Sequence, residues 1–444
     1  PLYGPRLVSA LAGTAATAAV FAAVRRLATR RAAVVAAGLY AALPWAMLYD
    51  RLAYAESMVN LAGAGLVWAS LRACGHERAA WPPALLAGAA MALGMATKTT
   101  MLAFAPVPLL AAWLGGRGLL TSKASRIALV YAVGMLPLAL GPLLTPEAPR
   151  GETSSSVLHK THFFVPPAQL LTSPLGALPE NAPALARFAA VYLTPAGLAA
   201  ILLGSGFLWA ERSRPAALLA AAGALPILAQ AWLIDRTFSR YPFPHVWPLL
   251  ALAALGLDRA LRTSRWRRPA AVLTGLTFAW FALASLRIVG TPRSGLAALD
   301  AGYFFGDAPN AGWGVVEASA HIRRAARAGG STLVLTDPIW GTPADAVFAY
   351  LNGKDGIRVA EAWWIEEGPA APLIPASRVE IWRSQYERVP GGALDFGDYA
   401  RVYYVTITNY RSREEVAVRQ PGARVELSIP KPNRTESLDV YRLR

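Results

Sequence analysis

The chain has 444 residues, of which 55% are hydrophobic and only 16% charged, and its mean hydropathy is +0.36. This composition is too apolar for an ordinary soluble protein. The net charge of +16 does not indicate a nucleic-acid partner, because the basic residues are spread over loops between apolar runs. The single cysteine, Cys74, excludes an internal disulfide and a Cys-rich metal site, and we interpret it as a small buried residue.

Ten apolar stretches follow one another along the first two thirds of the chain, and about 20 such residues cross the hydrocarbon layer of a membrane. The predicted spans are 5–24, 32–49, 56–71, 83–97, 99–115, 127–144, 187–209, 215–234, 243–261 and 269–288. Only Lys98 and Thr99 separate the fourth stretch from the fifth, so residues 83–115 form either two spans or one broken segment. The charge pattern favours two, since it keeps all later loops in phase.

Lys and Arg crowd into every second loop between these stretches. The basic loops contain Arg25, Arg26, Arg30 and Arg31, then Arg72 and Arg78, then Arg117, Lys123 and Arg126, then Arg212 and Arg214, and finally Arg259, Arg262, Arg265, Arg267 and Arg268. The other short loops carry only Arg51, Lys98 and the pair Arg236 and Arg240. Because short basic loops stay cytoplasmic, the alternation predicts a multi-pass protein of the cell (inner) membrane whose C-terminus is extracytoplasmic.

The predicted organisation is a transmembrane domain at 1–289 and a soluble extracytoplasmic α/β domain at 290–444. Within the first, residues 145–186 form a predicted extracytoplasmic loop whose apolar and aromatic residues suit a short helix on the membrane surface. In the second, strands are predicted at 331–337, 401–407, 424–429 and 438–443, with a helix at 314–330 that ends at Gly329 and Gly330. The predicted fold class is a polytopic α-helical membrane protein with a C-terminal mixed α/β domain.

The first candidate site is YDRLAYAES (49–57), between the second and third spans. Charged groups at membrane depth are costly and therefore mark functional sites. Here Glu56 is a candidate base or cation ligand and Arg51 a candidate anion binder, with Asp50 beside them. A structural salt bridge at a helix–helix turn explains the same residues, and from spacing alone it is the better explanation.

Two further clusters lie in the loops with few basic residues. Lys98, in a tight turn, is suited either to hold a phosphate or to reach the membrane interface. In IDRTFSRYPFPHVWPLL (234–250), Arg240 beside Tyr241 can grip a phosphate, with Arg236 nearby, or the segment is an interfacial anchor. Asp235 and His245 belong to the same segment.

A fourth cluster, His159, Lys160 and His162, lies in the predicted surface loop. Two histidines three residues apart can share a metal, but without acidic or cysteine neighbours they fit solvated loop residues better. The sequence contains no phosphate-binding glycine loop, nucleotide fingerprint, GxSxG or HExxH. Nothing therefore predicts a soluble nucleotide-sugar or ATP site.

Several segments together resemble a known family. PRLVSALAGTAATAAVFAAVRRL, LPWAMLYDRLAYAESMVN and ALGMATKTT resemble the polytopic GT-C-type glycosyltransferases of the protein O-mannosyltransferase and aminoarabinose-transferase group. SRYPFPHVWPLLALAALGL is similar to the Arg-Tyr element of that group. YFFGDAPNAGWGVVEASAHI and TDPIWGTPADAVFAYL resemble the extracytoplasmic domain of its bacterial members. The order and spacing of these segments, rather than any one of them, carry the resemblance.

The resemblance implies an enzyme that moves a sugar from a polyprenyl-phosphate carrier to an acceptor hydroxyl on the outer face, with inversion at the anomeric carbon. The family's general base lies in the loop after its first span. This sequence is similar to the family from its second span, so the base is expected upstream of Pro1. Glu56 matches the family's second acidic position, a supporting carboxylate that in some relatives helps bind a divalent cation.

The resemblance also places Lys98, Arg240 and Tyr241 near the carrier phosphate. Departure of a lipid phosphate needs a cationic pocket, because negative charge builds up there in the transition state. Arg51, Lys98, Arg236 and Arg240 all fall on the predicted outer side, and with Tyr241 and Lys160 they form the predicted substrate-binding set.

Two other functions are alternatives to glycosyl transfer. A transporter or flippase for a lipid-linked sugar should have related halves and polar or broken helices at mid-membrane, whereas Ala, Leu and Val dominate these spans. The other alternative is a non-catalytic membrane scaffold that displays residues 290–444. The sequence leaves open the sugar, the acceptor (protein, lipid or glycan), the metal requirement and the oligomeric state.

Overall fold

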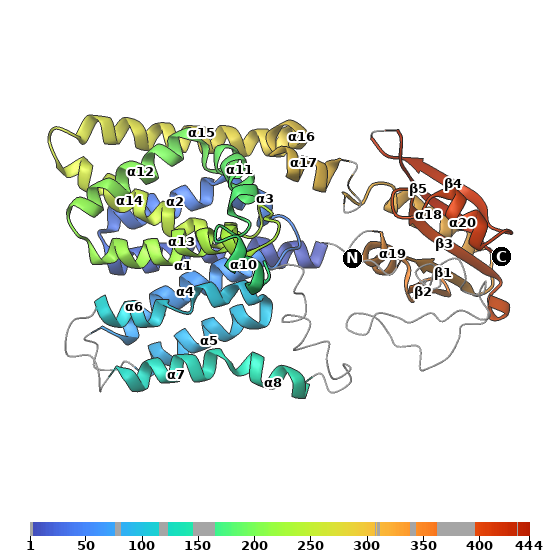
Figure 1. The fold of residues 1–444 in the computed structure, drawn as a ribbon, viewed down its shortest axis with the longest axis horizontal. Coiled ribbons are helices and arrows are strands. Elements are labelled where there is room, and N and C mark those ends of the chain that lie inside the picture. Colours follow the sequence, from blue (N-terminus) through green and yellow to red (C-terminus); the bar gives the residue numbers. More distant parts are fainter. Residues whose placement is uncertain are drawn as a thin grey trace. The chain divides into compact units, whose positions relative to one another are not determined.

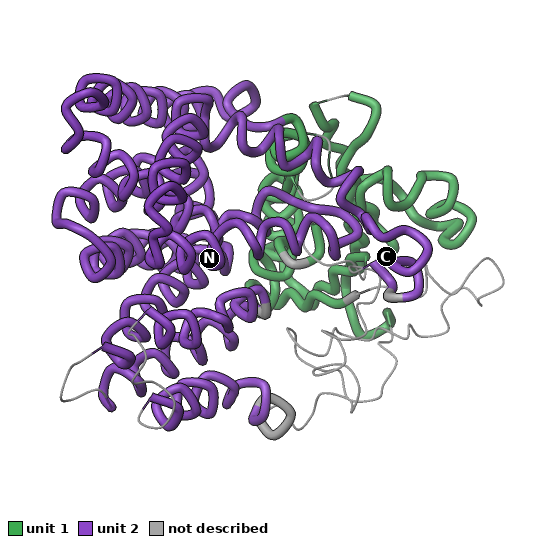
Figure 2. Tube along the Cα trace, turned by 60° about the vertical axis from the view of Figure 1, so that its left-hand side comes forward, with its two compact units in different colours: residues 1, 298–444 green, residues 2–297 purple. Residues whose placement is uncertain are grey.

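The computed structural model describes residues 3–75, 81–114, 123–144, 165–306, 308, 311–337, 343–361, 396–432 and 434–444. The chain divides into two compact units, residues 2–297 and residues 298–444 (Figure 2). The first unit is helical and the second contains a sheet flanked by helices (Figure 1). The protein is thus a helical membrane protein with a C-terminal mixed α/β domain, as predicted.

The first unit is a bundle of helices joined by short links. Its helices are α1 (Tyr3–Leu27), α2 (Arg30–Ala42), α3 (Pro44–Tyr49), α4 (Glu56–Ala73), α5 (Trp81–Thr97), α6 (Val107–Leu114), α7 (Ala124–Gly134), α8 (Leu136–Leu144), α10 (Pro167–Thr172), α11 (Leu178–Phe188), α12 (Thr194–Ala210), α13 (Arg214–Leu233), α14 (Val246–Arg262), α15 (Arg267–Gly290) and α16 (Pro292–Gly295). Short η1 (Thr99–Phe104), η3 (Ala189–Leu193) and η4 (Phe243–His245) lie between them. In the bundle α4 packs against α1 and α5, and α14 packs against α12 and α2.

Four helices of the described residues are long and apolar enough to cross a membrane: Tyr3–Leu27, Leu178–Ala210, Arg214–Leu233 and Arg267–Gly290. Other predicted spans are interrupted. Residues 32–49 break at Leu43 before Pro44, and the second half of 99–115 begins as a new helix after Pro106. Proline accounts for both breaks, because it lacks the amide hydrogen that would continue the helix. Before Pro44 it also moves Leu43 out of helical geometry, whereas Ala105 before Pro106 keeps helical dihedral angles.

Residues 83–115 form two segments rather than one broken helix. Helix α5 ends at Thr97, and Lys98 adopts an extended backbone before η1 begins. A Cβ atom added to Gly94 would lie 2.5 Å from the Met101 side chain. Because residues seven apart in a straight helix are about 10 Å apart along the axis, this contact shows that the chain folds back at Lys98.

The predicted loop 145–186 differs from the structure at its carboxyl end. Residues 178–188 form α11, which runs through η3 into α12 as one 33-residue apolar segment. The Pro-rich composition favoured a loop, but Pro179 occupies the start of the helix, where a missing amide hydrogen costs little. The segment proposed to lie on the membrane surface falls mainly outside the described residues, and within it α10 exposes Leu171.

The second unit is built on a five-stranded mixed sheet of order β2-β1-β3-β5-β4. Its strands are β1 (Thr332–Thr336), β2 (Ile357–Glu361), β3 (Arg401–Ile407), β4 (Arg424–Pro430) and β5 (Ser437–Arg442). Strand β1 pairs in parallel with β2 and β3, and β5 pairs antiparallel with β3 and β4. Helices α17 (Ala298–Phe305), α18 (Val315–Ala326), α19 (Ala344–Leu351) and α20 (Arg413–Arg419) and the short η7 (Phe396–Asp398) complete the unit.

Apolar side chains cover both faces of this sheet. Val334, Tyr403 and Val440 pack against Ile322 of α18, whereas Leu335 and Tyr404 on the other face pack with Val416 of α20. The amphipathic pattern of residues 315–326 explains why α18 lies flat on the sheet. The predicted strands and the helix before Gly329 are present, and β2, α19 and α20 are additional.

The buried carboxylate of Asp439 makes the pairing of β4 and β5 sensitive to acid. Asp439 on β5 is fully buried; burial raises its pKa, but hydrogen bonds from Arg413, Ser428 and Ser437 outweigh this and hold the pKa below the usual value of 3.8. A carboxyl with a depressed folded-state pKa stabilises the fold above its unfolded-state pKa, and that stabilisation is lost as the pH falls through the folded-state value. We therefore expect the protection of the β4 and β5 amides, measured against their intrinsic exchange rates, to decrease below pH of about 4. Asp439→Asn should remove this pH dependence, and an unchanged profile would contradict it.

Candidate functional site

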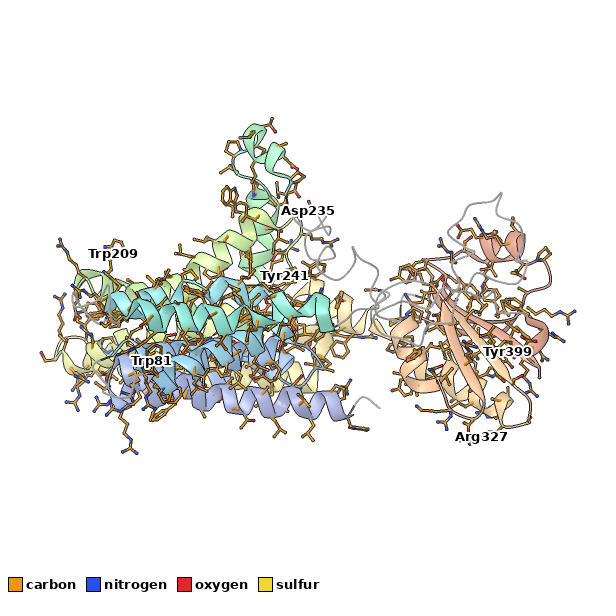
Figure 3. All side chains as sticks on the ribbon, turned by 90° about the horizontal axis from the view of Figure 1, so that it is seen from below. Trp81, Trp209, Asp235, Tyr241, Arg327 and Tyr399 are labelled. Atoms are coloured by element: carbon orange, nitrogen blue, oxygen red, sulfur yellow. The ribbon has the colours of Figure 1, made fainter. Side chains whose placement is uncertain are left out.

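Three links at one end of the bundle bring together residues from distant parts of the chain. The link from α3 to α4 carries Tyr54, Lys98 alone joins α5 to η1, and residues 234–242 join α13 to η4. Figure 3 shows Asp235 and Tyr241 at this end and Trp209 at the other. Glu56 opens α4 here, where the positive end of the helix dipole favours a carboxylate.

The centre of the site is an ion pair between Glu56 and Lys98. The Lys98 Nζ donates a hydrogen bond to Glu56 Oε1, although 42 positions separate the two residues. The Glu56 side chain is 1% exposed and that of Lys98 is 23% exposed. The carboxylate is therefore buried beneath an ammonium group that still reaches the surface of the unit.

Aromatic rings and a second cation surround this pair. Lys98 Nζ lies 5.3 Å from the centre of the Tyr241 ring, and the Arg240 guanidinium lies 5.3 Å from the same ring. Arg240 also lies 5.5 Å from the ring of Phe238 and 5.9 Å from that of Tyr54. We call Glu56, Lys98, Arg240 and Tyr241 the ion-pair cluster. Its two cations face one ring, an arrangement suited to holding an anion above an apolar surface.

Hydrogen bonds and stacked rings hold the residues beneath the cluster. The Tyr49 hydroxyl and the Ser239 hydroxyl lie 2.6 Å apart, which joins α3 to the segment before Arg240. The Tyr49 ring stacks on Phe243 at 5.4 Å, and Trp45 stacks on Tyr192 at 4.9 Å. Because all four rings are almost fully buried, the floor under Arg240 and Tyr241 is rigid.

The sequence reasoning missed Asn181. This buried residue of α11 donates hydrogen bonds to the carbonyls of Ala231 and Ile234 and accepts one from the Thr237 amide. These hydrogen bonds hold in place the segment between the end of α13 and Arg240. A lone Asn in a Pro-rich stretch gave no signal of this role.

We expect Asn181→Ala to destabilise the bundle by about 2 kcal/mol, because it leaves buried carbonyl and amide groups unpaired. Thermal unfolding in detergent would measure the loss. Asn352→Ala in the second unit is the control, since its side chain accepts a single backbone hydrogen bond, from Val359. A smaller effect at Asn181 than at Asn352 would contradict the anchoring role.

The other predicted site residues lie outside the cluster. Arg236 is exposed, with its guanidinium 5.8 Å from the Phe238 ring, and Asp235 is exposed as well. His245 is buried and packs against Phe104, with ring centres 4.8 Å apart. Lys160, with His159 and His162, lies outside the described residues.

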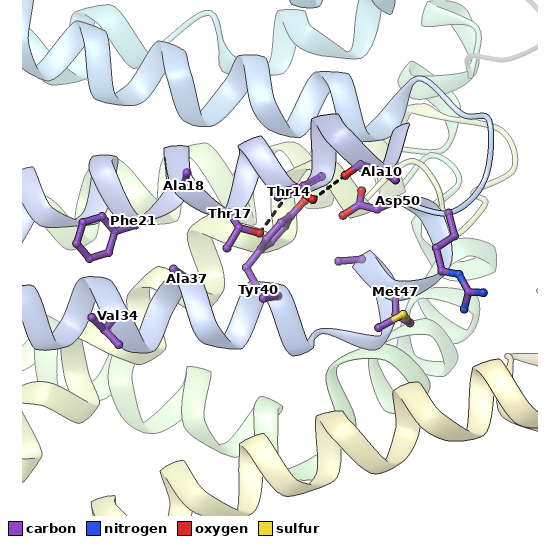
Figure 4. A pocket seen from close by; sticks show the side chains of 14 residues that line it. Ala10, Thr14, Thr17, Ala18, Phe21, Val34, Ala37, Tyr40, Met47 and Asp50 are labelled. Carbon is purple, nitrogen blue, oxygen red and sulfur yellow. Dashed lines mark hydrogen bonds between the residues drawn. The ribbon is translucent and has the colours of Figure 1, made fainter. Parts of the chain in front are cut away.

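Arg51 lines a separate groove between α1 and α2. The groove has a volume of about 710 Å³, and Phe21, Val34 and Met47 make it largely apolar. Figure 4 shows Thr14 and Thr17 turning their hydroxyls back to carbonyls of α1, so they offer little to a ligand. Asp50 closes one end, next to Gly13, whose missing side chain leaves room for the carboxylate. Neither Glu56, Lys98 nor Arg240 lines this groove.

The possible role of Glu56 in binding a divalent cation stays a prediction. The described residues contain no group of three His, Cys, Asp or Glu side chains able to share a metal ion. One oxygen of Glu56 accepts a hydrogen bond from the Lys98 ammonium, so in this arrangement the carboxylate orients Lys98.

Comparison with known proteins connects the first part of the chain to a family. Residues 3–144 match the family described as dolichyl-phosphate-mannose-protein mannosyltransferase. This stretch contains Glu56 and Lys98 but ends before Arg240 and the second unit. No curated protein matches the sequence.

Solved structures of an oligosaccharyltransferase from Archaeoglobus fulgidus show a distant similarity. One, called AglB and in complex with an inhibitory peptide and a dolichol-phosphate, has 14% identity and a TM-score of 0.39 over 78% of this chain and 52% of that chain. Another, in complex with Zn and sulfate, has 13% identity and a TM-score of 0.45 over 98% of this chain and 61% of that chain. The chain therefore spans little more than half the length of these proteins.

The family match covers the links that carry Glu56 and Lys98, the same residues on which the resemblance was based. It confirms that resemblance for the amino-terminal helices. Residues 3–144 are thus similar to the dolichyl-phosphate-mannose-protein mannosyltransferases.

Proposed function

We propose that the protein is a membrane glycosyltransferase that moves a hexosyl or pentosyl unit from a polyprenyl-phosphate carrier to an acceptor hydroxyl. The carrier phosphate leaves with the electron pair of the sugar C1–O bond, and the acceptor oxygen bonds to C1 from the opposite face, which inverts the anomeric carbon. The proton of the acceptor hydroxyl passes to the general base. The acceptor is a protein, lipid or glycan. The reaction is placed on the extracytoplasmic face, with the α/β domain on the same side.

The observation that carries this proposal is the convergence of Lys98, Arg240 and Tyr241 around the buried Glu56. Negative charge grows on the phosphate as it departs, so preorganised cations lower the barrier most when they are held in place beforehand. Glu56 holds Lys98, and the Tyr241 ring holds both cations over one surface. The cluster thus has the parts needed to receive a phosphate.

The remaining predicted residues have secondary roles in the proposal. Arg236 adds positive charge at the rim, and Arg51 adds it at the neighbouring groove. Lys160 keeps its proposed role in carrier binding on sequence grounds alone. The general base is not assigned to a residue of this chain.

A transporter remains a weaker explanation of the same residues. A transporter binds its substrate near mid-membrane, between two related halves. The ion-pair cluster instead lies in links between helices at one end of the bundle. A cluster of charged residues at the end of the bundle fits a reaction at the membrane surface better than passage across it.

The test is sugar transfer from radiolabelled polyprenyl-phosphate donors by the full chain in proteoliposomes, with Arg240→Gln beside the wild type. We expect at least a tenfold loss of transfer, because a charged partner of the departing phosphate is removed. Arg268→Gln, which removes an exposed charge at the opposite end, is the matched control and should retain full activity. Equal activity of all three proteins, or movement of intact donor across the bilayer without sugar release, would overturn the proposal.

A further inference from the structure

A second hollow lies at the other end of the bundle, where the basic loops gather. It is lined by the end of α6, the end of α12, the turn at 212–213 and the first half of α13, and it has a volume of about 500 Å³. We call it the basic groove; the residues used below are Trp113, Trp209, Arg212, Ser213, Arg214 and Ala217. Figure 3 shows Trp209 at this end of the unit, away from Tyr241.

The groove carries positive charge that no described carboxylate neutralises. Glu211, the nearest acidic residue in sequence, is paired with Arg259 of α14. Neither Arg212 nor Arg214 has an ion pair with a described residue, and the Arg214 guanidinium lies 5.5 Å from the centre of the Trp113 ring. Two uncompensated guanidinium groups beside one hollow attract an anion.

A buried hydroxyl in the same groove also lacks a partner. The Oγ atom of Ser213 is buried without a hydrogen bond among the described residues, although Ser213 precedes α13 in the position where Ser commonly caps a helix. The amides of the first turn of α13 therefore remain unbonded by this side chain. The hydroxyl and the positive end of the helix dipole add to the attraction of the two arginines for an anion.

The rest of the groove is apolar. Leu208, Ala217, Ala220 and Leu252 line it, and the two tryptophans are exposed, Trp209 by 87% and Trp113 by 46%. A free anion in water needs no such surface, whereas the first methylenes of an acyl chain do. Tryptophans beside basic residues are typical of the headgroup level of a membrane.

We propose that the basic groove binds one anionic glycerophospholipid. Its phosphate lies between Arg212 and Arg214 near the first turn of α13, and one acyl chain runs along the apolar faces of α12 and α13. This site is distinct from the ion-pair cluster, because the 20 residues of α13 place the two about 30 Å apart. The lipid is thus a bound component of the membrane rather than a donor of sugar.

The test counts lipids bound to the purified full chain by native mass spectrometry, with phosphatidylglycerol or phosphatidylcholine added to a neutral detergent. We expect one phosphatidylglycerol to be retained in clear preference to phosphatidylcholine. Arg212→Gln with Arg214→Gln should weaken its binding about 30-fold, since each cation contributes several-fold to binding of an anionic lipid. Arg267→Gln with Arg268→Gln removes the same charge from exposed positions at this end and should change the binding less than threefold.

A further variant separates the apolar part from the charged part. Ala217→Phe fills the groove without changing its charge and should also displace the lipid. Equal losses in the two double variants would show diffuse attraction to a basic surface and overturn the proposal. Displacement of phosphatidylglycerol by inorganic phosphate, or by a polyprenyl phosphate at equal concentration, would overturn it too. Unfolding temperatures in lipid-free detergent identify any variant that has lost its fold. Ala217→Phe and the double variant change different features of the groove, so each tests the proposal independently of the other.

Discussion

Replacing Lys98 by Met is expected to lower sugar transfer by about a hundredfold or more, which is the usual effect of removing a preorganised group that stabilises transition-state charge. Lys98 supplies the ammonium that faces Tyr241 and is held by Glu56. Methionine keeps the length and much of the shape of the side chain. A loss of sugar transfer would therefore be caused by the missing charge rather than by altered packing.

The same change should also destabilise the protein, by about 3–5 kcal/mol, because it leaves the buried Glu56 carboxylate without its partner. The double variant Glu56→Gln with Lys98→Met separates the two effects. It removes both charges, so most of the stability should return while transfer stays low. Recovery of transfer in the double variant would mean that Lys98 only neutralises Glu56 and has no role at the phosphate.

The measurement combines initial transfer rates in proteoliposomes with unfolding temperatures in detergent. Arg268→Met is the matched control, since it removes a cation from an exposed position at the other end of the bundle. We expect this control to match the wild type in both assays. A wild-type rate for Lys98→Met would contradict the role of the ion-pair cluster.

Most of the helices and strands could be predicted from local sequence patterns. Residues 401–407 concentrate β-branched and aromatic side chains, which predicts β3, and Gly329 and Gly330 correctly mark the region where α18 ends. The strand β2 was missed because IRVAE is short and contains two charged residues. Its place at the edge of the sheet beside β1, rather than its own sequence, makes it a strand.

Contacts between residues that are far apart in the chain could not be predicted from the sequence. The predicted topology puts Glu56, Lys98 and Arg240 on one side of the membrane, but the register of α4, α5 and α14 decides which of their side chains meet. That register depends on close packing between helices, which is visible only in three dimensions. The hydrogen bonds of Asn181 to the 231–237 segment depend on it in the same way.

We expect the packing between helices to be most sensitive to substitution at Gly256. Helices α12 and α14 approach so closely that a Cβ atom on Gly256 would lie 2.1 Å from the Cα atom of Gly204. The obstacle is backbone rather than a movable side chain, so an added methyl group must force the helices apart. Small residues at such crossings are what allow helices to associate closely in membranes.

Gly256→Ala should therefore destabilise the first unit by about 3 kcal/mol, the upper part of the range for overpacking. Gly206→Ala on α12 is the control, because a Cβ there meets no atom within 4 Å. In that open position alanine favours the helix by about 1 kcal/mol, so the two substitutions should have opposite signs. Unfolding temperatures of the two variants in one detergent test this directly, and a shared sign would contradict the predicted contact.

We expect this change to affect the ion-pair cluster as well, although Gly256 lies in the second half of α14, away from η4. The helix continues from η4 and the segment that carries Arg240 and Tyr241, so a shift of α14 away from α12 moves these residues relative to Lys98. We expect Gly256→Ala to reduce sugar transfer even at temperatures where the protein remains folded, while Gly206→Ala leaves it unchanged. A folded Gly256→Ala protein with normal transfer would show that the cluster is positioned by the local contacts of Tyr49 and Asn181 alone, independently of how α14 packs.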